Sequence, residues 1–376
     1  MLANASIGKQ QIDLFDDLFT IPELRKSIAP EMPFDDGLTY FNAPTIDLSI
    51  YDHIIVSMSG GKDSIAAFLE ILDMGADKSK IELWHNAVDG RGGKPFMDWM
   101  FMDDFNIKIA EHYGVPLYFS WLEHGFKGEM LKNESYSHPH KVETPDGLIT
   151  LERDRAKIGT RLKFPQQSPS LQTRWCSSAL KIDVARRALN NQDRFHGKKI
   201  LFITGERREE SANRSKYNQL EVHACDTRNG RLGRHVDAWR TVLHWSEEQV
   251  WAKLQEHGFA APVPYRLGWN RSSCMTCIYN GPAIWATLFE YFPDRANQIL
   301  EYEKQFNTTI SRKRLNVFEI SENVRPIEIT DMKALEQALS TEYTLPIITD
   351  NWQISLQSST SLPELTGSLS HRIRQN

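Results

Sequence analysis

Short apolar runs alternate with stretches of helical spacing along the first two thirds of the chain. Runs rich in β-branched and other apolar residues predict strands at 53–57, 81–84, 115–121 and 198–204. Apolar residues at helical spacing predict helices over 65–74 and 101–112. Strands that alternate with helices form right-handed crossovers and a parallel sheet covered on both faces. The pattern therefore predicts an α/β fold with a Rossmann-like, doubly wound parallel sheet.

Changes in this pattern divide the chain into parts. The segment 122–172 has little periodicity and is interpreted as an insertion within the main domain, with a lid as one interpretation. Phe15, Leu18 and Ile21 indicate a short amphipathic helix near the start, and helices are also predicted over 285–292 and 296–306. The four parts are an N-terminal extension (1–45), the main domain (46–280), a helical C-terminal region (281–356) and a tail predicted to be mobile (357–376).

Composition and charge restrict the function classes. No run approaches the roughly 20 apolar residues that a spanning helix needs, which excludes a transmembrane enzyme. The first ten residues lack the basic start and apolar stretch of a secretory signal, so the expected location is the cytoplasm. The net charge of -5 argues against a uniformly basic surface for nucleic acid. Residues 152–187 nevertheless carry nine basic and three acidic side chains, a net +6, which suits either an anionic ligand in a cleft or a solvated basic face.

The strongest local motif lies between the first strand and the first helix. We call Ser59-Gly60-Gly61-Lys62-Asp63-Ser64 the glycine loop. Its two glycines let backbone N–H groups approach an anion, and the following helix presents its positive dipole end. Lys62 adds a charge, the two serines can donate hydrogen bonds, and Asp63 can hold Mg²⁺ or cap the helix. The loop differs from the longer GxxxxGK[ST] arch. It predicts phosphate binding, with a capped Gly-rich turn as the alternative.

Further polar residues follow the second and fourth predicted strands. Asp89 falls in the loop after the second strand and is predicted to belong to the nucleotide site, whereas His85 either contacts a ligand or belongs to a satisfied polar turn. After the fourth strand, Arg207 and Arg214 are predicted to bind phosphate or sulfonate at the start of a helix. Within that helix Glu206 would face Glu210, and Arg207 would face Ser211. The alternative is a charged helix start with internal ion pairs.

The chain has four cysteines, too few for a disulfide scaffold. Cys274 and Cys277 form a CxxC pair, and Cys176 lies about a hundred residues upstream. Thiolates at this spacing can share a metal if the fold brings Cys176 to the pair. Cys225 stands in a polar loop and is interpreted as a bystander. Trp245, Trp251 and Trp285 are predicted to be core aromatics.

Taken together, these segments resemble a known family. The sequence SGGKDS after a strand resembles the PP-loop signature of ATP pyrophosphatases. Further segments narrow the resemblance to the phosphoadenosine phosphosulfate (PAPS) reductase-like branch, over about residues 50–280. They are Arg174-Trp175-Cys176 with Lys181, Gly205 to Ser211 with Arg214, Trp245-Ser246 with Val250-Trp251, and Pro264-Tyr265 with the CxxC pair.

The resemblance implies cofactors and site residues. It implies ATP with Mg²⁺, with Lys62, Asp63, Arg207 and Arg214 as catalytic residues. It also implies a [4Fe–4S] cluster on Cys176, Cys274 and Cys277, with zinc or unligated thiols as alternatives. The branch's reductases have a Cys-Cys pair where this chain has Cys176-Ser177, which leaves an open iron or a fourth ligand such as Cys225. The residues expected to bind nucleotide are Ser59, Gly60, Gly61, Lys62, Asp63, Ser64, Asp89, Arg174, Lys181, Gly205 and Glu206.

One departure from the family decides among its activities. Assimilatory sulfonucleotide reductases carry a catalytic cysteine near the C-terminus, and this chain has no cysteine after Cys277. The leading hypothesis is therefore an AMP-forming ATP pyrophosphatase that adenylates a substrate for sulfur transfer. The residue set is most similar to DNA phosphorothioation ATP pyrophosphatases and to PAPS reductase-like proteins of phages and mobile elements. The partners that the resemblance implies are a cysteine desulfurase or other sulfur donor, DNA, and the subunits of a modification complex. The alternatives are a reductase that uses an external thiol and a non-catalytic nucleotide- and cluster-binding subunit.

Overall fold

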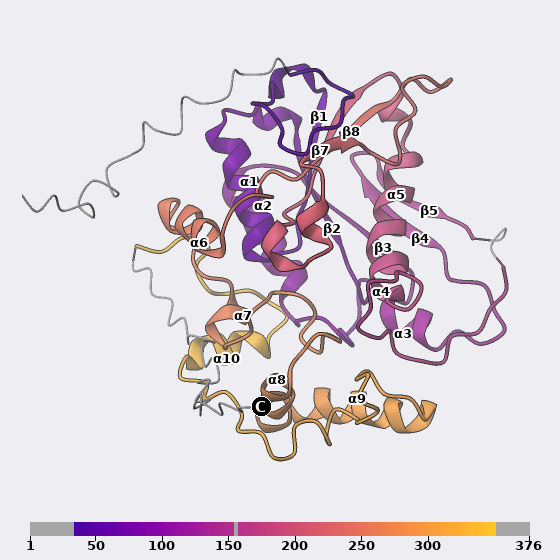
Figure 1. Cartoon of the computed structure of the whole chain (residues 1–376), viewed down its shortest axis with the longest axis vertical. Helices are drawn as coiled ribbons and strands as arrows, with labels where there is room; N and C mark the ends of the chain where they lie inside the picture. The colour runs from indigo at the N-terminus through magenta and orange to yellow at the C-terminus, as the bar shows by residue number, and fades with distance from the viewer. Residues whose placement is uncertain (1–33, 154–156, 351–376) are drawn as a thin grey trace, which may run out of the picture.

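A mixed eight-stranded sheet forms the centre of the computed structural model, which describes residues 34–153 and 157–350 (Figure 1). Its order is β5-β4-β3-β2-β1-β6-β8-β7. The five central strands are parallel: β3 (Leu117–Leu122), β2 (Ile81–Asn86), β1 (His53–Ser57), β6 (Lys199–Ile203) and β8 (His235–Trp239). The strands at the two edges are antiparallel: β4 (His140–Thr144), β5 (Gly147–Leu151) and β7 (Leu220–Val222). The predicted fold class is confirmed.

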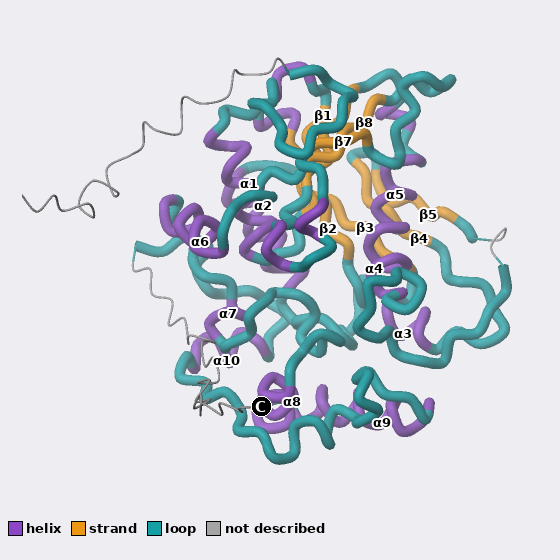
Figure 2. Tube along the Cα trace, viewed as in Figure 1, coloured by secondary structure: helices purple, strands orange, loops and turns teal. Residues whose placement is uncertain are grey.

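Both faces of the sheet are covered, as the alternation of side chains in β1 shows. Ile54 and Val56 pack into the larger core, which includes apolar side chains of α1 (Lys62–Asp73) and α2 (Met102–Tyr113). Ile55 points to the other face, where it joins a smaller cluster with residues of α5 (Asp183–Asn190). Figure 2 shows the strands between these two sets of helices. The layers are those of a doubly wound sheet.

The segment 122–172 differs from its prediction. It contains the helix α3 (Gly125–Met130) and the hairpin of β4 and β5, which continues the sheet through the pairing of Ser120 with Val142. The expectation of little regular structure is wrong for this part. Each hairpin strand has only five residues, so its alternation is too short to stand out in the sequence.

Of the helices from the last third of the chain, α6 (Glu247–Glu256) packs beside α1, and the others lie below the sheet in Figure 1. These are α7 (Val263–Arg266), α8 (Pro282–Tyr291), α9 (Pro293–Phe306) and α10 (Met332–Ala338). The helices predicted at 285–292 and 296–306 are confirmed as α8 and α9. In the described ranges, no helix has both the length and the apolar character to span a bilayer. The helix predicted near 15–21 and the tail at 357–376 lie outside the described residues.

Candidate functional site

The glycine loop leads from the carboxyl end of β1 into α1. Gly60 has φ +73°, and a Cβ at this position would lie 2.5 Å from the Met102 sulfur, so the turn needs glycine twice over. Gly61 is the N-cap of α1 and provides no side-chain cap. The Ser64 hydroxyl lies 3.2 Å from the Ser59 amide and 2.9 Å from the Gly61 carbonyl. The loop is therefore a compact turn that leaves the start of α1 without a side-chain cap.

Lys62 is buried, and its ammonium group is surrounded by one carboxylate of its own loop and by side chains from later in the chain. Its Nζ lies 3.4 Å from Asp63 Oδ2 and 3.4 Å from Glu247 Oε1. It also lies over the rings of Tyr265 (5.1 Å to the centroid) and Trp251 (5.8 Å). Burial alone would lower the pKa of Lys62, but Tyr265 and the two carboxylates outweigh it and raise that pKa. Lys62 is thus a cation fixed at the start of α1.

The segment after β6 forms the other wall of the glycine loop. Gly205 packs so closely on α1 that a Cβ would lie 2.5 Å from the Asp63 carbonyl oxygen. Two residues later, the buried Arg207 donates from Nε to Asp63 Oδ1 at 2.5 Å and from Nη1 to Glu209 Oε2 at 2.9 Å. Burial lowers the pKa of Arg207, but the Asp63 carboxylate raises it to a greater extent. Asp63 consequently lies between two cations, Lys62 and Arg207.

The other residues predicted after β6 have different partners. Glu206 accepts hydrogen bonds from Thr204 Oγ1 and Arg240 Nε, both at 2.9 Å, and Arg214 forms an ion pair with Glu210. The segment forms two single 3-10 turns, η7 (Arg208–Glu210) and η8 (Arg214–Lys216), instead of a helix. The predicted pairing of Glu206 with Glu210 is therefore wrong, because Arg240 and Asp63 hold the side chains of Glu206 and Arg207 apart.

Three of the four cysteines come together below the sheet. Cys176 lies in the short helix α4 (Trp175–Ser177), and Cys274 and Cys277 form a turn in which the Cys277 amide donates to the Cys274 carbonyl at 3.1 Å. All three pack against the larger core. Lys181 is exposed as a whole residue, but its ammonium group is enclosed beside all three thiols. Burial lowers the pKa of Lys181, but Cys274, Cys176 and Asp98 raise it by more, so the pKa lies above its usual value.

Cys225 does not belong to this group. It is buried in the smaller cluster on the α5 face, where its sulfur lies 3.8 Å from the Arg186 carbonyl oxygen. This position does not favour Cys225 as a fourth ligand, because it packs in a different cluster from the other three thiols. The interpretation of Cys225 as a bystander agrees with this position.

Asp89 lies beside the cysteines, away from the glycine loop. Its Oδ2 accepts the amides of Met97 and Asp98, both at 2.8 Å, and its Oδ1 is buried without a partner among the described residues. Burial, together with the nearby Asp98 carboxylate, raises the pKa of Asp89 to about 6. Arg295 lies close enough to Asp89, Asp98 and Cys274 to interact electrostatically with all three. The cysteines thus share their surroundings with two carboxylates and two cations.

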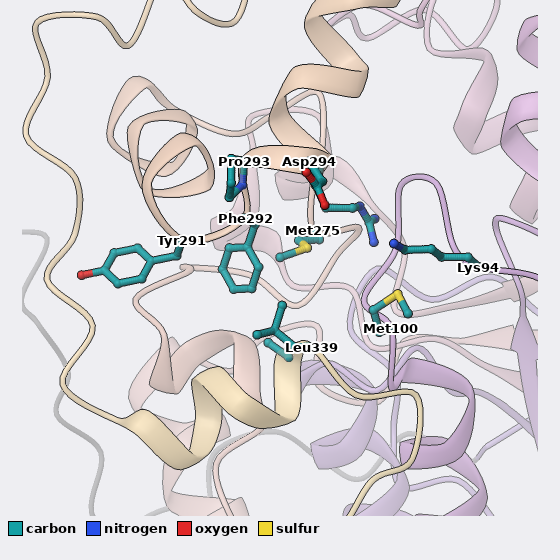
Figure 3. Close-up of a pocket in the computed structure, with 10 residues that line it drawn as sticks. Lys94, Met100, Met275, Tyr291, Phe292, Pro293, Asp294 and Leu339 are labelled. Carbon is teal, nitrogen blue, oxygen red and sulfur yellow. The ribbon is translucent and has the colours of Figure 1, made fainter.

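Two cavities adjoin this region. One of about 260 Å³ is lined by Asp89, Asp98 and Asp103. The other, of about 240 Å³, lies behind the cysteine turn and is shown in Figure 3, where Met100, Met275 and Phe292 surround it. Neither cavity includes a residue of the glycine loop among its lining. The groups that the loop itself presents are its backbone amides and the charges of Lys62 and Asp63.

The remaining predicted residues are placed as follows. His85 is buried behind the glycine loop, with Nδ1 2.8 Å from the Met58 carbonyl oxygen and Nε2 3.9 Å from Asp103 Oδ1. Arg174 donates from Nη1 to the Tyr279 hydroxyl at 3.1 Å, near the cysteines. Trp251 and Trp285 are buried, as predicted for core aromatics, whereas Trp245 is partly exposed.

Sequence reasoning assigned no role to Glu247 or Tyr265, two of the neighbours of Lys62. Tyr265 Oη also accepts the Lys62 and Ser272 amides, both at 3.2 Å. The segment Pro264-Tyr265 was a visible signal for this residue, because it is one of the family-like segments. Glu247 had no signal of its own, although it lies inside the family-like segment that runs from Trp245 to Trp251.

Comparisons with known proteins give limited matches. No protein-family model matches the chain. An uncharacterised 37.8 kDa protein of Escherichia phage 186 is 26% identical over 264 residues, which cover 66% of this chain and 74% of the phage protein. Among solved structures, the PAPS reductase of Candida auris in complex with phosphate matches with a TM-score of 0.28 and 13% identity. That match covers 56% of this chain and 74% of the reductase, and the fold assignment rests on the strand order and not on this likeness.

Proposed function

We propose that the chain is a PP-loop ATP pyrophosphatase that adenylates an acceptor for sulfur transfer, with a nucleic-acid phosphate as the acceptor. The observation that carries the proposal is the arrangement of Lys62, Asp63 and Arg207 at the uncapped start of α1. Two buried cations and a helix N-terminus meet there, at the carboxyl end of a central strand of a doubly wound sheet. Such a set favours a polyanion such as the triphosphate of ATP.

The proposed reaction has two steps. An acceptor oxygen attacks the α-phosphorus of ATP, the bond to the bridging oxygen breaks, and pyrophosphate leaves with the electron pair. A sulfur nucleophile then displaces AMP from the acceptor. Lys62 and Arg207 offset the charge that develops on the leaving phosphates, Asp63 orients both cations, and its carboxylate would be available to a Mg²⁺ that accompanies ATP.

The cysteine set fits an iron–sulfur cluster. Three thiols from two distant segments converge next to Lys181 and Arg295, whose charges would offset those of thiolates. Within the described residues, the one group of three or more potential ligands with ligand atoms inside 4.8 Å is Asp73, Glu256 and His257. The proposal of a cluster therefore rests on the three converging thiols and the two neighbouring cations, and a bound cluster would hold or position the transferred sulfur.

The first test measures products. We expect the protein to convert ATP to AMP and pyrophosphate, and Lys62→Met to lower the rate on the order of 100-fold by removing a buried phosphate-facing charge. Lys108→Met removes an exposed lysine on α2 and is the matched control, which should retain the wild-type rate. Sulfite release from PAPS, with no pyrophosphate from ATP, would instead support a reductase that uses an external thiol. If neither pyrophosphate nor sulfite forms in the presence of nucleic acid, the result would support a non-catalytic subunit.

A second test measures metal. Anaerobically purified protein should be brown and contain about four iron atoms per chain. Cys176→Ala and Cys277→Ala should lose the iron, and Cys225→Ala should retain it, because Cys225 lies on the other face of the sheet. A colourless, iron-free protein from the same preparation would remove the sulfur-transfer step and leave the nucleotide site without a second centre.

A further inference from the structure

An exposed aromatic ring flanked by two arginines lies beside the cysteines. Tyr279 follows Cys277 by two residues and is 37% exposed. The Arg271 guanidinium lies 5.5 Å from the centre of its ring, and Arg174 Nη1 lies 3.1 Å from its hydroxyl. Neither arginine forms an ion pair with any described residue, so both charges are available to an anionic partner.

A cationic groove continues from this ring. Its volume is about 760 Å³, and its cations are Lys304, Arg312 and Arg314, which are all exposed and form no ion pair within the described part of the chain. Hydroxyl and amide side chains fill the spaces between these cations. They are Gln166, Asn307, Thr308, Thr309, Ser311 and Asn316.

The carboxylates that line the groove are engaged with the backbone. Glu303 is buried and accepts the Ile310 and Val317 amides at 2.7 and 2.8 Å, and burial raises its pKa. Glu319 accepts the Asn316 amide at 2.7 Å. Because Glu303 is buried, the groove presents three cations against the single exposed carboxylate of Glu319, and its exposed charge is positive.

The ring and the groove belong to one surface, because the loop 166–168 contacts both. The Gln166 side-chain amide donates to the Thr309 carbonyl at 3.0 Å, and Gln167 donates to the Ile278 carbonyl at 2.8 Å. In Figure 1 the chain that follows α9 lies below the loop that leads into α4. A ligand along this surface would therefore end next to the cysteines.

We propose that this surface binds a single strand of nucleic acid, with a base stacked on Tyr279 and the phosphates along Arg174, Arg271, Arg312 and Arg314. An aromatic ring between guanidinium groups stacks on the open face of an unpaired base, and such stacking tolerates any sequence. A duplex keeps its base faces covered. The acceptor role of the strand rests on the proposed function, whereas the binding does not require ATP.

The test is fluorescence anisotropy of a labelled 20-nucleotide single-stranded DNA, the same strand as RNA, and the DNA duplex, without nucleotide. Tyr279→Ala should weaken single-strand binding on the order of tenfold, and Tyr279→Phe should retain it, since the ring remains. Arg312→Ala combined with Arg314→Ala should reduce the slope of log K against log salt by about 1.4, from about 0.7 per lost phosphate contact. Lys198→Ala combined with Arg231→Ala removes two exposed cations at the amino-end edge of the sheet and is the matched control.

Binding of either single-stranded DNA or single-stranded RNA supports the proposed surface, and the strand that binds more tightly identifies the preferred sugar. Duplex binding as tight as single-strand binding, or Tyr279→Ala binding at wild-type affinity, would overturn it. Pyrophosphate release from ATP without single-strand binding overturns this inference alone. Single-strand binding without pyrophosphate release overturns the proposed function alone.

Discussion

Asp63 is the residue on which the candidate site depends most. Its two carboxylate oxygens face different cations, Oδ1 toward Arg207 at 2.5 Å and Oδ2 toward Lys62 at 3.4 Å. Breaking such a partly buried pair would leave charges without compensation, which costs more than the pair itself contributes. Asp63 therefore holds in place the two cations to which the proposed function assigns the phosphates. The sequence identified all three residues, but only the fold shows that they contact one another.

One buried histidine makes the free energy of unfolding depend on pH. His140 in β4 is fully buried, and burial, together with Arg153 and Arg187, lowers its pKa from 6.5 to about 3, against an opposing effect of Glu129. Below pH 6.5 the unfolded chain binds a proton that the folded chain excludes, so stability falls as the pH drops toward 3. The slope is about 1.4 kcal/mol per pH unit. Between pH 7 and pH 5, His140→Gln should therefore lose about 2 kcal/mol less unfolding free energy than wild type in urea titrations.

The exposed His196 provides the control for this measurement. It lies at the surface just before β6, and His196→Gln should retain the wild-type pH dependence. An unchanged pH dependence in His140→Gln would show that other groups are responsible.

At the scale of elements, the crossovers around the glycine loop were predictable and the edges of the sheet were not. The strand at 53–57 has a continuous run of buried apolar residues, the helix after it has clear helical spacing, and the two appear as β1 and α1. The β4–β5 hairpin gave no comparable signal, since the apolar residues of β5 are exposed or half-buried and do not line one buried face. The candidate site follows the same rule. Local motifs identified Lys62 and Arg207, whereas the contact of Lys62 with Glu247 depends on the packing of α6 on α1, which no local pattern encodes.

The start of α6 controls the position of Glu247 and offers a test. Ser246 caps the helix: its hydroxyl accepts the Gln249 amide at 3.3 Å, and Gln249 Oε1 accepts the Ser246 amide at 2.9 Å. We expect Ser246→Ala to lower the free energy of unfolding by about 1 kcal/mol. The pyrophosphatase rate should also fall, because the first turn of α6 carries Glu247. Gln255→Ala on the exposed side of α6 is the control, and equal effects of the two variants would contradict a capping role.

At the scale of the whole molecule, the fold determines which charged side chains have partners and which remain free to meet a ligand. Several cations of the basic segment 152–187 have internal partners: Arg161 pairs with Glu129 at 2.6 Å, and Arg187 donates to the Glu152 carbonyl at 3.0 Å. The groove near Arg312 and Arg314 comes instead from the C-terminal region, which the sequence marked only as helical. Charge counts along a chain do not reveal which cations have partners, because the partners lie far away in sequence.

The position of β1 at the centre of the sheet has a consequence for biosynthesis. One neighbour, β2, follows within 30 residues, but the other, β6, begins at Lys199, and the Lys62 amide donates to Tyr265, 203 residues away. On the ribosome the glycine loop emerges early, yet its second wall and its buried cover do not exist until residue 265 has left the exit tunnel. A nascent or truncated chain therefore has the motif without the site, and the proposed nucleotide site is complete only when synthesis is well past the midpoint.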